Sequence, residues 1–336
     1  MERALYEPDL GYYAASDQRP TRAGDFLTAP ELHPLFGHVI ARRLDAMWQA
    51  AGQPDPFAVR EFGAGSGTLF LAIVNGLRQQ RSSLAEAIRY QPVDLARQRS
   101  TLLGRLAGAG LSGTLSEGPL DDPLIGVVLA NEFLDALPVH LVTRQAGEMR
   151  EVYVDWQDGR FGEQVGELSD ARLSEWFSGS GVELAEGQRA AVNLAMLDWV
   201  TQLGSHLQTG FAIVIDYGAS AAELYAGQRM TGTLRAFRDH HVSSDVLTAV
   251  GHQDITAHVD FDALERGARA AGLTIVERKR QAEFLIESGL EEAYAAARVE
   301  SDQDWSAALS LRSAVRRLVD PQALGGYQVV VLSKGV

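Results

Sequence analysis

The sequence of 336 residues contains no cysteine, which excludes disulfide bonds and thiolate chemistry but does not fix the redox compartment. It also lacks an apolar run close to the roughly 18 residues that a membrane-spanning helix needs, and no charged-then-apolar leader opens it. These absences argue against membrane insertion and secretion. We therefore expect a cytoplasmic protein without a membrane partner.

Basic residues are scarce relative to acidic ones, and the formal net charge is -14. This charge disfavours binding to nucleic acid, because contacts with phosphates need a basic surface. An acidic surface suits a basic partner, although solubility alone explains the charge equally well. The composition thus predicts no nucleic-acid partner.

Short apolar runs predict a sheet. Near-continuous apolarity over such lengths is typical of strands that are buried on both faces of a parallel sheet. Amphipathic helical patterns fill the intervals between the runs, and alternation of strand and helix predicts an α/β doubly wound fold. The predicted strands occupy residues 57–62, 88–94, 125–130, 211–216 and 327–333.

The last third of the chain refines this prediction. Asp260 could cap a helix that Gly272 ends, and TIVERKR then predicts a strand before a helical insertion at about 281–320. Two late strands would form an antiparallel edge. This layout resembles the class I S-adenosylmethionine-dependent methyltransferase fold (Rossmann-like), which implies a mostly parallel sheet of seven strands with an antiparallel last strand.

The same resemblance suggests a domain organisation. We expect an N-terminal helical or lid segment at 1–52 and a methyltransferase domain at 53–336, with insertions at about 140–187, 217–258 and 281–325. The first insertion, with a hairpin around 141–165, follows the fourth strand, and the second follows the fifth. Both lie at carboxyl ends of strands, where open α/β sheets bind ligands.

A glycine-rich loop, EFGAGSGTL, occupies residues 61–69. A dinucleotide-binding fingerprint would have a glycine at position 68, where this chain has Thr68. The pattern resembles motif I of class I methyltransferases, in which the acid, here Glu61, helps to place the ammonium group of S-adenosylmethionine. Its glycines, Gly63, Gly65 and Gly67, would let the backbone approach the cofactor without a Cβ in the way. The alternative is a tight strand-to-helix turn that binds nothing.

An acidic residue, Asp94, ends the next predicted strand. A carboxylate at this place can accept hydrogen bonds from both ribose hydroxyls of a nucleotide or of S-adenosylmethionine. The structural alternative is an N-cap for a helix at 95–107.

Polar residues cluster in ANEFLDALPVH, residues 130–140, directly after a buried strand. Asn131, Glu132 and Asp135 are the candidate catalytic residues, with Glu132 and Asp135 facing the methyl acceptor. Two carboxylates suit an arginine, because a guanidinium pairs with carboxylate oxygens in a bidentate manner. The alternative is a capped turn.

Further motifs occur along nearly the whole chain: GYYAAS at 11–16, GDFLTAPELHPLFG at 24–37, IDYG at 215–218, GTLRAFRDH at 232–240 and DITAHVDF at 254–261. Together with EFGAGSGTL and ANEFLDALPVH, they resemble the MidA-like methyltransferases. This family includes the mitochondrial protein-arginine methyltransferase that assists assembly of respiratory complex I. Membership implies methyl transfer from S-adenosylmethionine to an arginine of a partner protein.

The stretch at 24–37 precedes the first sheet strand and is well placed to fold over the cofactor. We take Asp25, Thr28 and Glu31 as lid residues that bind the cofactor, although glycines and prolines here also fit plain turns. Family members usually carry a further helical segment before the GYY motif, so part of the lid could be absent from this chain.

Histidines and aspartates gather at 239–260, but their spacing matches no tight ligand motif, and we expect no metal. Three rival functions remain: an assembly factor that binds S-adenosylmethionine but is catalytically weak, a methyltransferase for a small molecule, and a nicotinamide-dependent oxidoreductase. Thr68 and the antiparallel last strand disfavour the oxidoreductase. The oligomeric state is not predicted.

Overall fold

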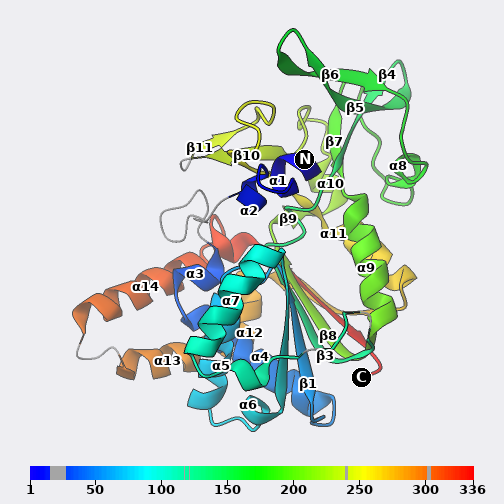
Figure 1. The fold of residues 1–336 in the computed structure, drawn as a ribbon. Coiled ribbons are helices and arrows are strands. Elements are labelled where there is room, and N and C mark those ends of the chain that lie inside the picture. The colour runs from blue at the N-terminus through cyan, green and yellow to red at the C-terminus, as the bar shows by residue number, and fades with distance from the viewer. Residues whose placement is uncertain (16–27, 117, 121, 239–240, 301–303) are drawn as a thin grey trace. The chain divides into compact units, whose positions relative to one another are not determined.

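The computed structural model describes the chain except for residues 16–27, 117, 121, 239–240 and 301–303 (Figure 1). It contains two compact units, each built from three segments. Unit 1 comprises Met1–Phe26, Leu134–Gln202 and Tyr217–Ala270, and unit 2 comprises Leu27–Phe133, Leu203–Asp216 and Ala271–Val336. The segment 1–52 and the domain 53–336 expected from the sequence do not coincide with these units and remain a prediction.

Unit 2 is built on a six-stranded mixed sheet in the order β14-β15-β8-β3-β1-β2. The pairs β1–β2, β1–β3 and β3–β8 are parallel, whereas β15 runs antiparallel to both of its neighbours. The strands are β1 (Phe57–Phe62), β2 (Ile88–Val93), β3 (Leu124–Asn131), β8 (Leu207–Asp216), β14 (Thr274–Arg280) and β15 (Gln328–Lys334). Each predicted apolar run thus forms a strand, and the antiparallel strand is the last one in the chain.

The described residues form six strands in this sheet, so the expected count of seven is not confirmed. The chain does return beside the outer strand β2, but Leu115 makes only an isolated parallel bridge to Tyr90. Gly118 and Pro119 follow at once. Glycine weakens a strand and proline cannot donate to its ladder, so the local sequence stops a further strand there.

Helices of unit 2 cover one face of this sheet (Figure 1). Alternate residues of the strands, such as Val127 and Leu129 of β3, join a core cluster with the buried faces of α4, α5 and the late helices. The helices are α3 (Ala29–Leu32), α4 (Leu35–Ala50), α5 (Thr68–Gln79), α6 (Leu84–Ala87), α7 (Ala96–Gly108), α12 (Gln281–Glu287), α13 (Leu290–Glu300) and α14 (Trp305–Val319), with 3-10 turns η1 (Ser112–Thr114) and η2 (Leu324–Gly326).

Two glycines let α4 and α5 pack closely. A Cβ on Gly37 would come 2.3 Å from the Cβ of Ala72, and one on Gly76 would come 2.9 Å from the Cβ of Ala41. Both distances are far shorter than carbon atoms tolerate. The crossing holds α5, and therefore the loop that begins it, against the core.

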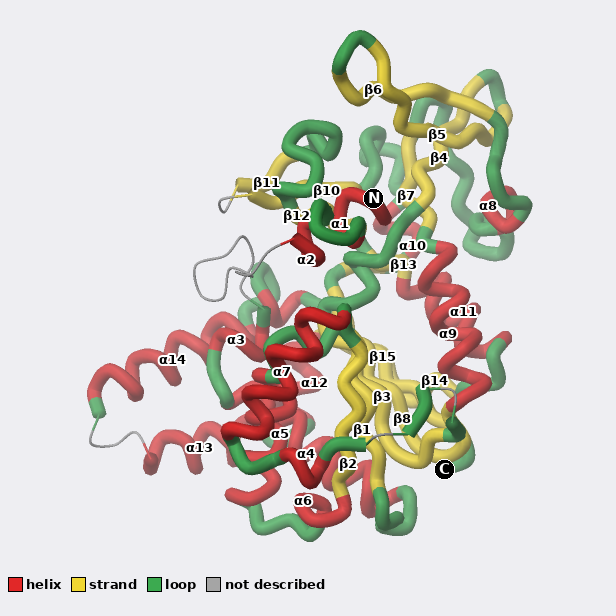
Figure 2. Tube along the Cα trace, in the orientation of Figure 1, coloured by secondary structure: helices red, strands yellow, loops and turns green. Residues whose placement is uncertain are grey.

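Unit 1 contains three smaller sheets, drawn yellow in Figure 2. Four antiparallel strands have the order β6-β5-β4-β7, three have the order β11-β10-β12, and β13 pairs with β9. The first sheet confirms the predicted hairpin around 141–165. The strands are β4 (His140–Gln145), β5 (Glu148–Gln157), β6 (Arg160–Gly166), β7 (Arg189–Val192), β9 (Gly218–Ala219), β10 (Leu234–Arg238), β11 (His241–Ser243), β12 (Asp254–Ala257) and β13 (Val259–Asp260).

The helices of unit 1 are mostly short. Among the described helices that lie wholly within unit 1, α11 is the longest. The N–H of Ala263 in this helix donates to Asp260 Oδ1 at 2.9 Å, which confirms the predicted cap. The helices are α1 (Glu2–Tyr6), α2 (Tyr12–Ala15), α8 (Arg172–Glu175), α10 (Ala221–Leu224) and α11 (Phe261–Ala270), while α9 (Leu194–His206) runs from unit 1 into unit 2. In the part of the chain described, no helix has both the length and the apolarity to cross a membrane.

Candidate active site

The glycine loop connects β1 to α5 in unit 2 and depends on backbone angles that favour glycine. Gly63, Gly65 and Gly67 have φ values of 65°, 55° and 74°. A Cβ on Gly67, the residue that precedes α5, would also lie 3.0 Å from Leu102 Cγ. Since L-residues rarely adopt positive φ, the three glycines let the loop take this conformation and leave its backbone without Cβ atoms that would cover it.

Asp94 lies beside this loop, as the sequence predicts. Its Oδ2 accepts the N–H of Gly65 at 2.6 Å, and its Oδ1 accepts the N–H of Leu95 at 2.7 Å. The following helix, α7, has Leu95 at its N-cap and no side-chain cap hydrogen bond. The carboxylate therefore binds the glycine loop instead of capping the helix, which argues against the structural alternative.

Glu61 lies beneath the loop, near the end of β1. It is 4 % exposed, and Tyr90 donates a hydrogen bond to its Oε2 at 2.5 Å. Burial raises the pKa of Glu61 to about 8, the charge of Asp94 adds to this effect, and the bond from Tyr90 opposes it. An ammonium group nearby would favour the ionised carboxylate again. The predicted contact between Glu61 and the cofactor's ammonium group stays a prediction.

Asn131 and Glu132 follow the adjacent parallel strand. Asn131 ends β3, and Glu132 has a φ of 49°, a left-handed conformation that is unusual for a residue with a side chain. The N–H of Glu132 donates to the carbonyl of Ile215 in β8 at 2.8 Å. This backbone bond extends the β3–β8 pairing by one residue and holds the backbone of Glu132 against β8.

The side chain of Glu132 reaches the start of α3. Its Oε1 accepts the N–H of Ala29 at 3.3 Å and the amide of Asn131 at 3.1 Å. Thr28 precedes this helix and Glu31 lies in its first turn, so both predicted lid residues belong to the segment that Glu132 contacts. Asp25, the third predicted lid residue, lies outside the described residues.

Asp135 belongs to unit 1, whereas Glu132 belongs to unit 2. It is 5 % exposed, and its backbone carbonyl accepts the N–H of Ala257 at 2.9 Å. Burial and the charge of Asp254 together raise the pKa of Asp135 to about 7, against the lowering effect of hydrogen bonds from Tyr217 and from the backbone. The structure therefore brings Asp135 under the electrostatic influence of Asp254, a residue of the segment 239–260 that the sequence considered only for a metal.

Two tyrosines near Asp254, Tyr13 and Tyr6, had no role predicted from the sequence. The hydroxyl of Tyr13 donates to Asp254 Oδ1 at 2.7 Å, and the ring of Tyr6 stacks on that of Tyr13 at 5.7 Å between centroids. Tyr13 and Asp254 occur in the GYYAAS and DITAHVDF motifs, and these motifs were the one signal that could have drawn attention to them. No spacing rule links residues so far apart in the sequence.

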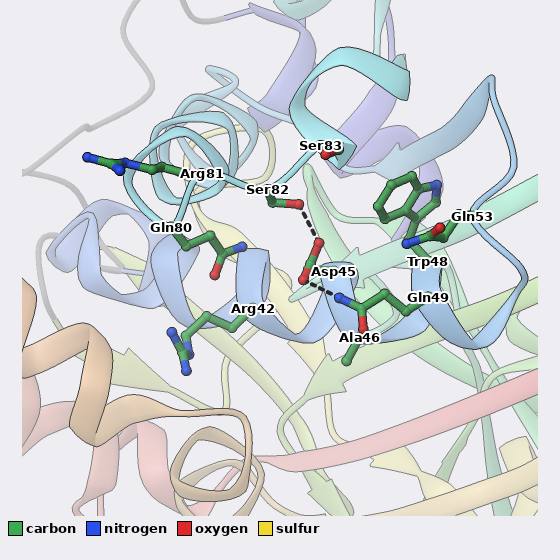
Figure 3. A pocket seen from close by; sticks show the side chains of 10 residues that line it. All are labelled: Arg42, Asp45, Ala46, Trp48, Gln49, Gln53, Gln80, Arg81, Ser82 and Ser83. Carbon is green, nitrogen blue, oxygen red and sulfur yellow. Dashed lines mark hydrogen bonds between the residues drawn. The ribbon is translucent and has the colours of Figure 1, made fainter.

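Unit 2 also has a cavity of about 510 Å³, which does not include the glycine loop (Figure 3). It is lined by the C-terminal half of α4 and by residues that follow α4 and α5, with Asp45 hydrogen-bonded to Ser82 and to Gln49. Because α5 begins at the glycine loop and has 12 residues, the cavity lies roughly 18 Å from that loop along the helix. It is therefore separate from the cofactor residues.

Within the described ranges, no three His, Cys, Asp or Glu side chains lie close enough together to hold a metal ion. The segment 239–260 that was considered for a metal includes residues 239–240, which lie outside that description. The absence of a metal thus stays a prediction.

The arrangement of unit 2 defines a class of protein. A mostly parallel sheet with one antiparallel strand inserted beside β14, a glycine loop after β1 and an acid after β2 are the features of a methyltransferase fold that binds S-adenosylmethionine. The residues fit this cofactor. No Cβ atoms of the three glycines cover the loop backbone, and the carboxylate of Asp94 is hydrogen-bonded to that backbone at Gly65.

Comparisons with known proteins agree. The model of a family described as "Putative S-adenosyl-L-methionine-dependent methyltransferase" matches residues 39–278, and the chain belongs to this family. A crystal structure of a superfamily member from Burkholderia thailandensis, bound to S-adenosyl-homocysteine, is 33 % identical with a TM-score of 0.87, and the match covers 100 % of this chain and 86 % of that one. The chain is therefore an S-adenosylmethionine-dependent methyltransferase, as its motifs predicted.

Relatives with assigned names include the mitochondrial protein arginine methyltransferase NDUFAF7 of Danio rerio, which is 30 % identical over 80 % of this chain and 67 % of its own length. The Drosophila melanogaster homologue is 28 % identical over 97 % of this chain and 78 % of its own length, and the Homo sapiens protein is 29 % identical over 87 % and 69 %. These matches confirm the family resemblance of the motifs.

The names also correct one expectation. A cytoplasmic location was inferred from the absence of a leader and of apolar runs, but these relatives are all named mitochondrial. The composition of a folded chain carries no signal of the compartment, so the inference had no physical support beyond a default.

Proposed function

We propose that the chain transfers a methyl group from S-adenosylmethionine to an arginine side chain of a partner protein. The observation that carries this proposal is the similarity, over 80 % of the chain or more, to proteins named protein arginine methyltransferases. The carboxylates of Glu132 and Asp135 support it, because acidic side chains bind a guanidinium through charge-assisted hydrogen bonds.

The geometry of the loop and of Asp94 supports the roles that we propose for the cofactor residues. S-adenosylmethionine supplies an electrophilic methyl group on a sulfonium. The loop of Gly63, Gly65 and Gly67 would hold the methionyl part through its backbone, Asp94 would accept from the ribose hydroxyls, and Glu61 would pair with the ammonium group. We further propose that Thr28 and Glu31, together with Asp25, form a lid over the cofactor.

The acceptor residues would work mainly by alignment. Holding a nucleophile in line with the group that it attacks can supply roughly 7–11 kcal/mol of the barrier reduction. In this proposal Glu132 orients the guanidinium and draws its positive charge away from the attacking nitrogen, with Asn131 holding the carboxylate of Glu132 in place. For Asp135, which belongs to unit 1, we propose a role as a carboxylate that binds a guanidinium.

The substitution Glu132→Gln tests this role. Glutamine keeps the oxygen that accepts from Ala29 and Asn131 but removes the charge. We expect affinity for S-adenosylmethionine, measured by calorimetry, to change less than about twofold and turnover to fall roughly 10- to 100-fold, the range for losing a hydrogen bond to a charged group. Glu86→Gln, an exposed change in α6, is the matched control. Unchanged turnover in Glu132→Gln would remove Glu132 from the mechanism.

The acceptor class needs its own experiment. Mass spectrometry of methylarginine in lysates with and without the gene should show sites that are lost when the gene is deleted. Loss of a methylated small molecule with no change in methylarginine would instead favour a small-molecule acceptor. Binding of S-adenosylmethionine without transfer to any acceptor would favour an assembly factor.

A further inference from the structure

Two carboxylates of unit 1 lie in one electrostatic environment together with tyrosines. Asp254 begins β12, and the backbone of Asp135 is bonded to Ala257 at the end of the same short strand. The charge of Asp254 raises the pKa of Asp135 and that of Tyr13, whose hydroxyl donates to Asp254 at 2.7 Å. We name Asp135, Asp254, Tyr13 and Tyr6 the carboxylate–tyrosine cluster.

The tyrosine rings of this cluster are ordered by mutual contact. Tyr6 stacks on Tyr13 with an interplanar angle of 23°, and Tyr12 meets the edge of Tyr13 at 5.2 Å between centroids. Tyr6 also donates to the carbonyl of Ala136 at 2.8 Å, which ties the N-terminal rings to the segment of Asp135. Aromatic faces attract cations, and they do so more strongly where water is excluded.

A buried hydroxyl on β12 is a second, independent sign of a ligand. Thr256 is 5 % exposed, and its Oγ1 finds no hydrogen-bond partner within the described part of the chain. Because side chains alternate along a strand, Asp254 and Thr256 point to the same side of β12. Leaving a buried hydroxyl unbonded is unfavourable, and an N–H donor of a ligand would satisfy it.

The chemistry of the cluster selects a planar cation with several donors. Two carboxylates at close quarters disfavour each other's charge, and a cation between them relieves that repulsion. A guanidinium presents five N–H donors in one plane, enough for both carboxylates and a hydroxyl, whereas an ammonium is a compact point charge with three. Asp254 is partly exposed, so the cluster is open to a ligand from solvent.

We propose that the carboxylate–tyrosine cluster binds the guanidinium group of the arginine acceptor, with Asp254 and Asp135 as its carboxylate ligands and Tyr13 positioning Asp254. This inference rests on the proposed function and adds residues to it. It makes Asp254 a substrate-binding residue, and it assigns the GYYAAS and DITAHVDF motifs to recognition of the acceptor.

Asp254→Asn tests the proposal in the full-length chain. Proteins from cells that lack the gene serve as acceptors, with radiolabelled S-adenosylmethionine as donor, and labelled methylarginine is measured after hydrolysis. We expect Asp254→Asn to lower its formation roughly 30- to 100-fold and to leave S-adenosylmethionine affinity within about twofold, because a charge-assisted bond to the acceptor is lost. Asp198→Asn, an exposed aspartate of unit 1 that pairs with Arg172, should behave as wild type.

Tyr13→Phe is a second variant that keeps the ring and removes one hydrogen bond. It should raise the KM for acceptor proteins severalfold with kcat and S-adenosylmethionine affinity nearly unchanged, a split that general destabilisation would not produce. Ethylguanidinium should inhibit the wild-type enzyme competitively against acceptor, and ethylurea, its neutral isostere, should not. Asp254→Asn should weaken this inhibition by a similar factor to its effect on methylation.

The outcomes separate this inference from the proposed function. Labelled methylarginine that forms equally well with Asp254→Asn, or equal inhibition by ethylurea and ethylguanidinium, would overturn the inference alone. Label that appears on another residue type and never on arginine would overturn the proposed function. Should Asp254→Asn melt well below wild type, the split expected for Tyr13→Phe decides the matter.

Discussion

Replacing Glu61 by glutamine should make unit 2 more stable at neutral pH. In the folded chain the pKa of Glu61 is raised from 4.5 to about 8, mainly by burial. The unfolded chain, in which the side chain is hydrated, releases the proton near pH 4.5. Between these two values the folded state holds a proton that the unfolded state has lost, so the free energy of unfolding falls as the pH rises.

The magnitude follows from this interval. Between pH 4.5 and pH 7 the free energy of unfolding falls by about 1.4 kcal/mol for each pH unit, or by about 3 kcal/mol in all. Glutamine can still accept the hydrogen bond of Tyr90 but does not titrate. At 2–4 °C per kcal/mol, Glu61→Gln should therefore melt roughly 6–12 °C above wild type at pH 7, and close to it at pH 4.5.

Thermal melting followed by circular dichroism between pH 4.5 and 8 measures this difference. The exposed change Glu86→Gln in α6 of the same unit serves as control and should follow wild type throughout. Melting curves of Glu61→Gln that stay parallel to wild type at every pH, or a difference that grows toward low pH, would refute the reasoning.

The same substitution should impair cofactor binding. If Glu61 pairs with the ammonium group, the carboxyl must ionise on binding, so the wild-type chain should release a proton when it binds S-adenosylmethionine below pH 8. Calorimetry in buffers of different ionisation enthalpy detects that proton. Glu61→Gln should release none and should bind roughly 10- to 100-fold more weakly. Equal affinity would exclude the contact.

Two further substitutions test the loop and the packing behind it. Asp94→Ala should weaken S-adenosylmethionine binding roughly 10- to 100-fold in calorimetry, because it removes the carboxylate that lies 2.6 Å from the loop backbone. Gly37→Ala should lower stability by about 1–3 kcal/mol in thermal melting, since its Cβ would lie 2.3 Å from another Cβ in α5. Gly104→Ala in α7, where nothing lies within 4 Å, should instead stabilise slightly, and a loss as large as that of Gly37→Ala would contradict the packing argument.

The sheet could be predicted because its strands are buried on both faces, so that runs such as 211–216 are apolar almost throughout. The number of strands, seven, could not be predicted from the residues, since it came from the layout of the family. Next to β2 the chain has Gly118 and Pro119, and local chemistry outweighed the layout. Local composition was therefore the better guide to that edge.

The two halves of the candidate site differ in how far sequence could predict them. Asp94 and Gly65 meet because neighbouring parallel strands end at one edge, a rule that needs only the strand assignments. Tyr13 and Asp254 are 241 positions apart and join an N-terminal helix region to an insertion. Pairing within such insertions has no periodic signal, so only the folded structure shows that Asp135 has Asp254 as its neighbour.

The motif at 130–140 links the two units through a single covalent crossing between Phe133 and Leu134. On one side the N–H of Glu132 is bonded to β8, and on the other the carbonyl of Asp135 is bonded to β12. Cofactor residues thus belong to one unit and the carboxylate–tyrosine cluster to the other. Substitutions at Asp94 should alter S-adenosylmethionine affinity alone, and those at Asp254 should alter the KM for acceptor alone. Changes at Phe133 or Leu134 should affect both, because these residues lie between Glu132 and Asp135 in the chain.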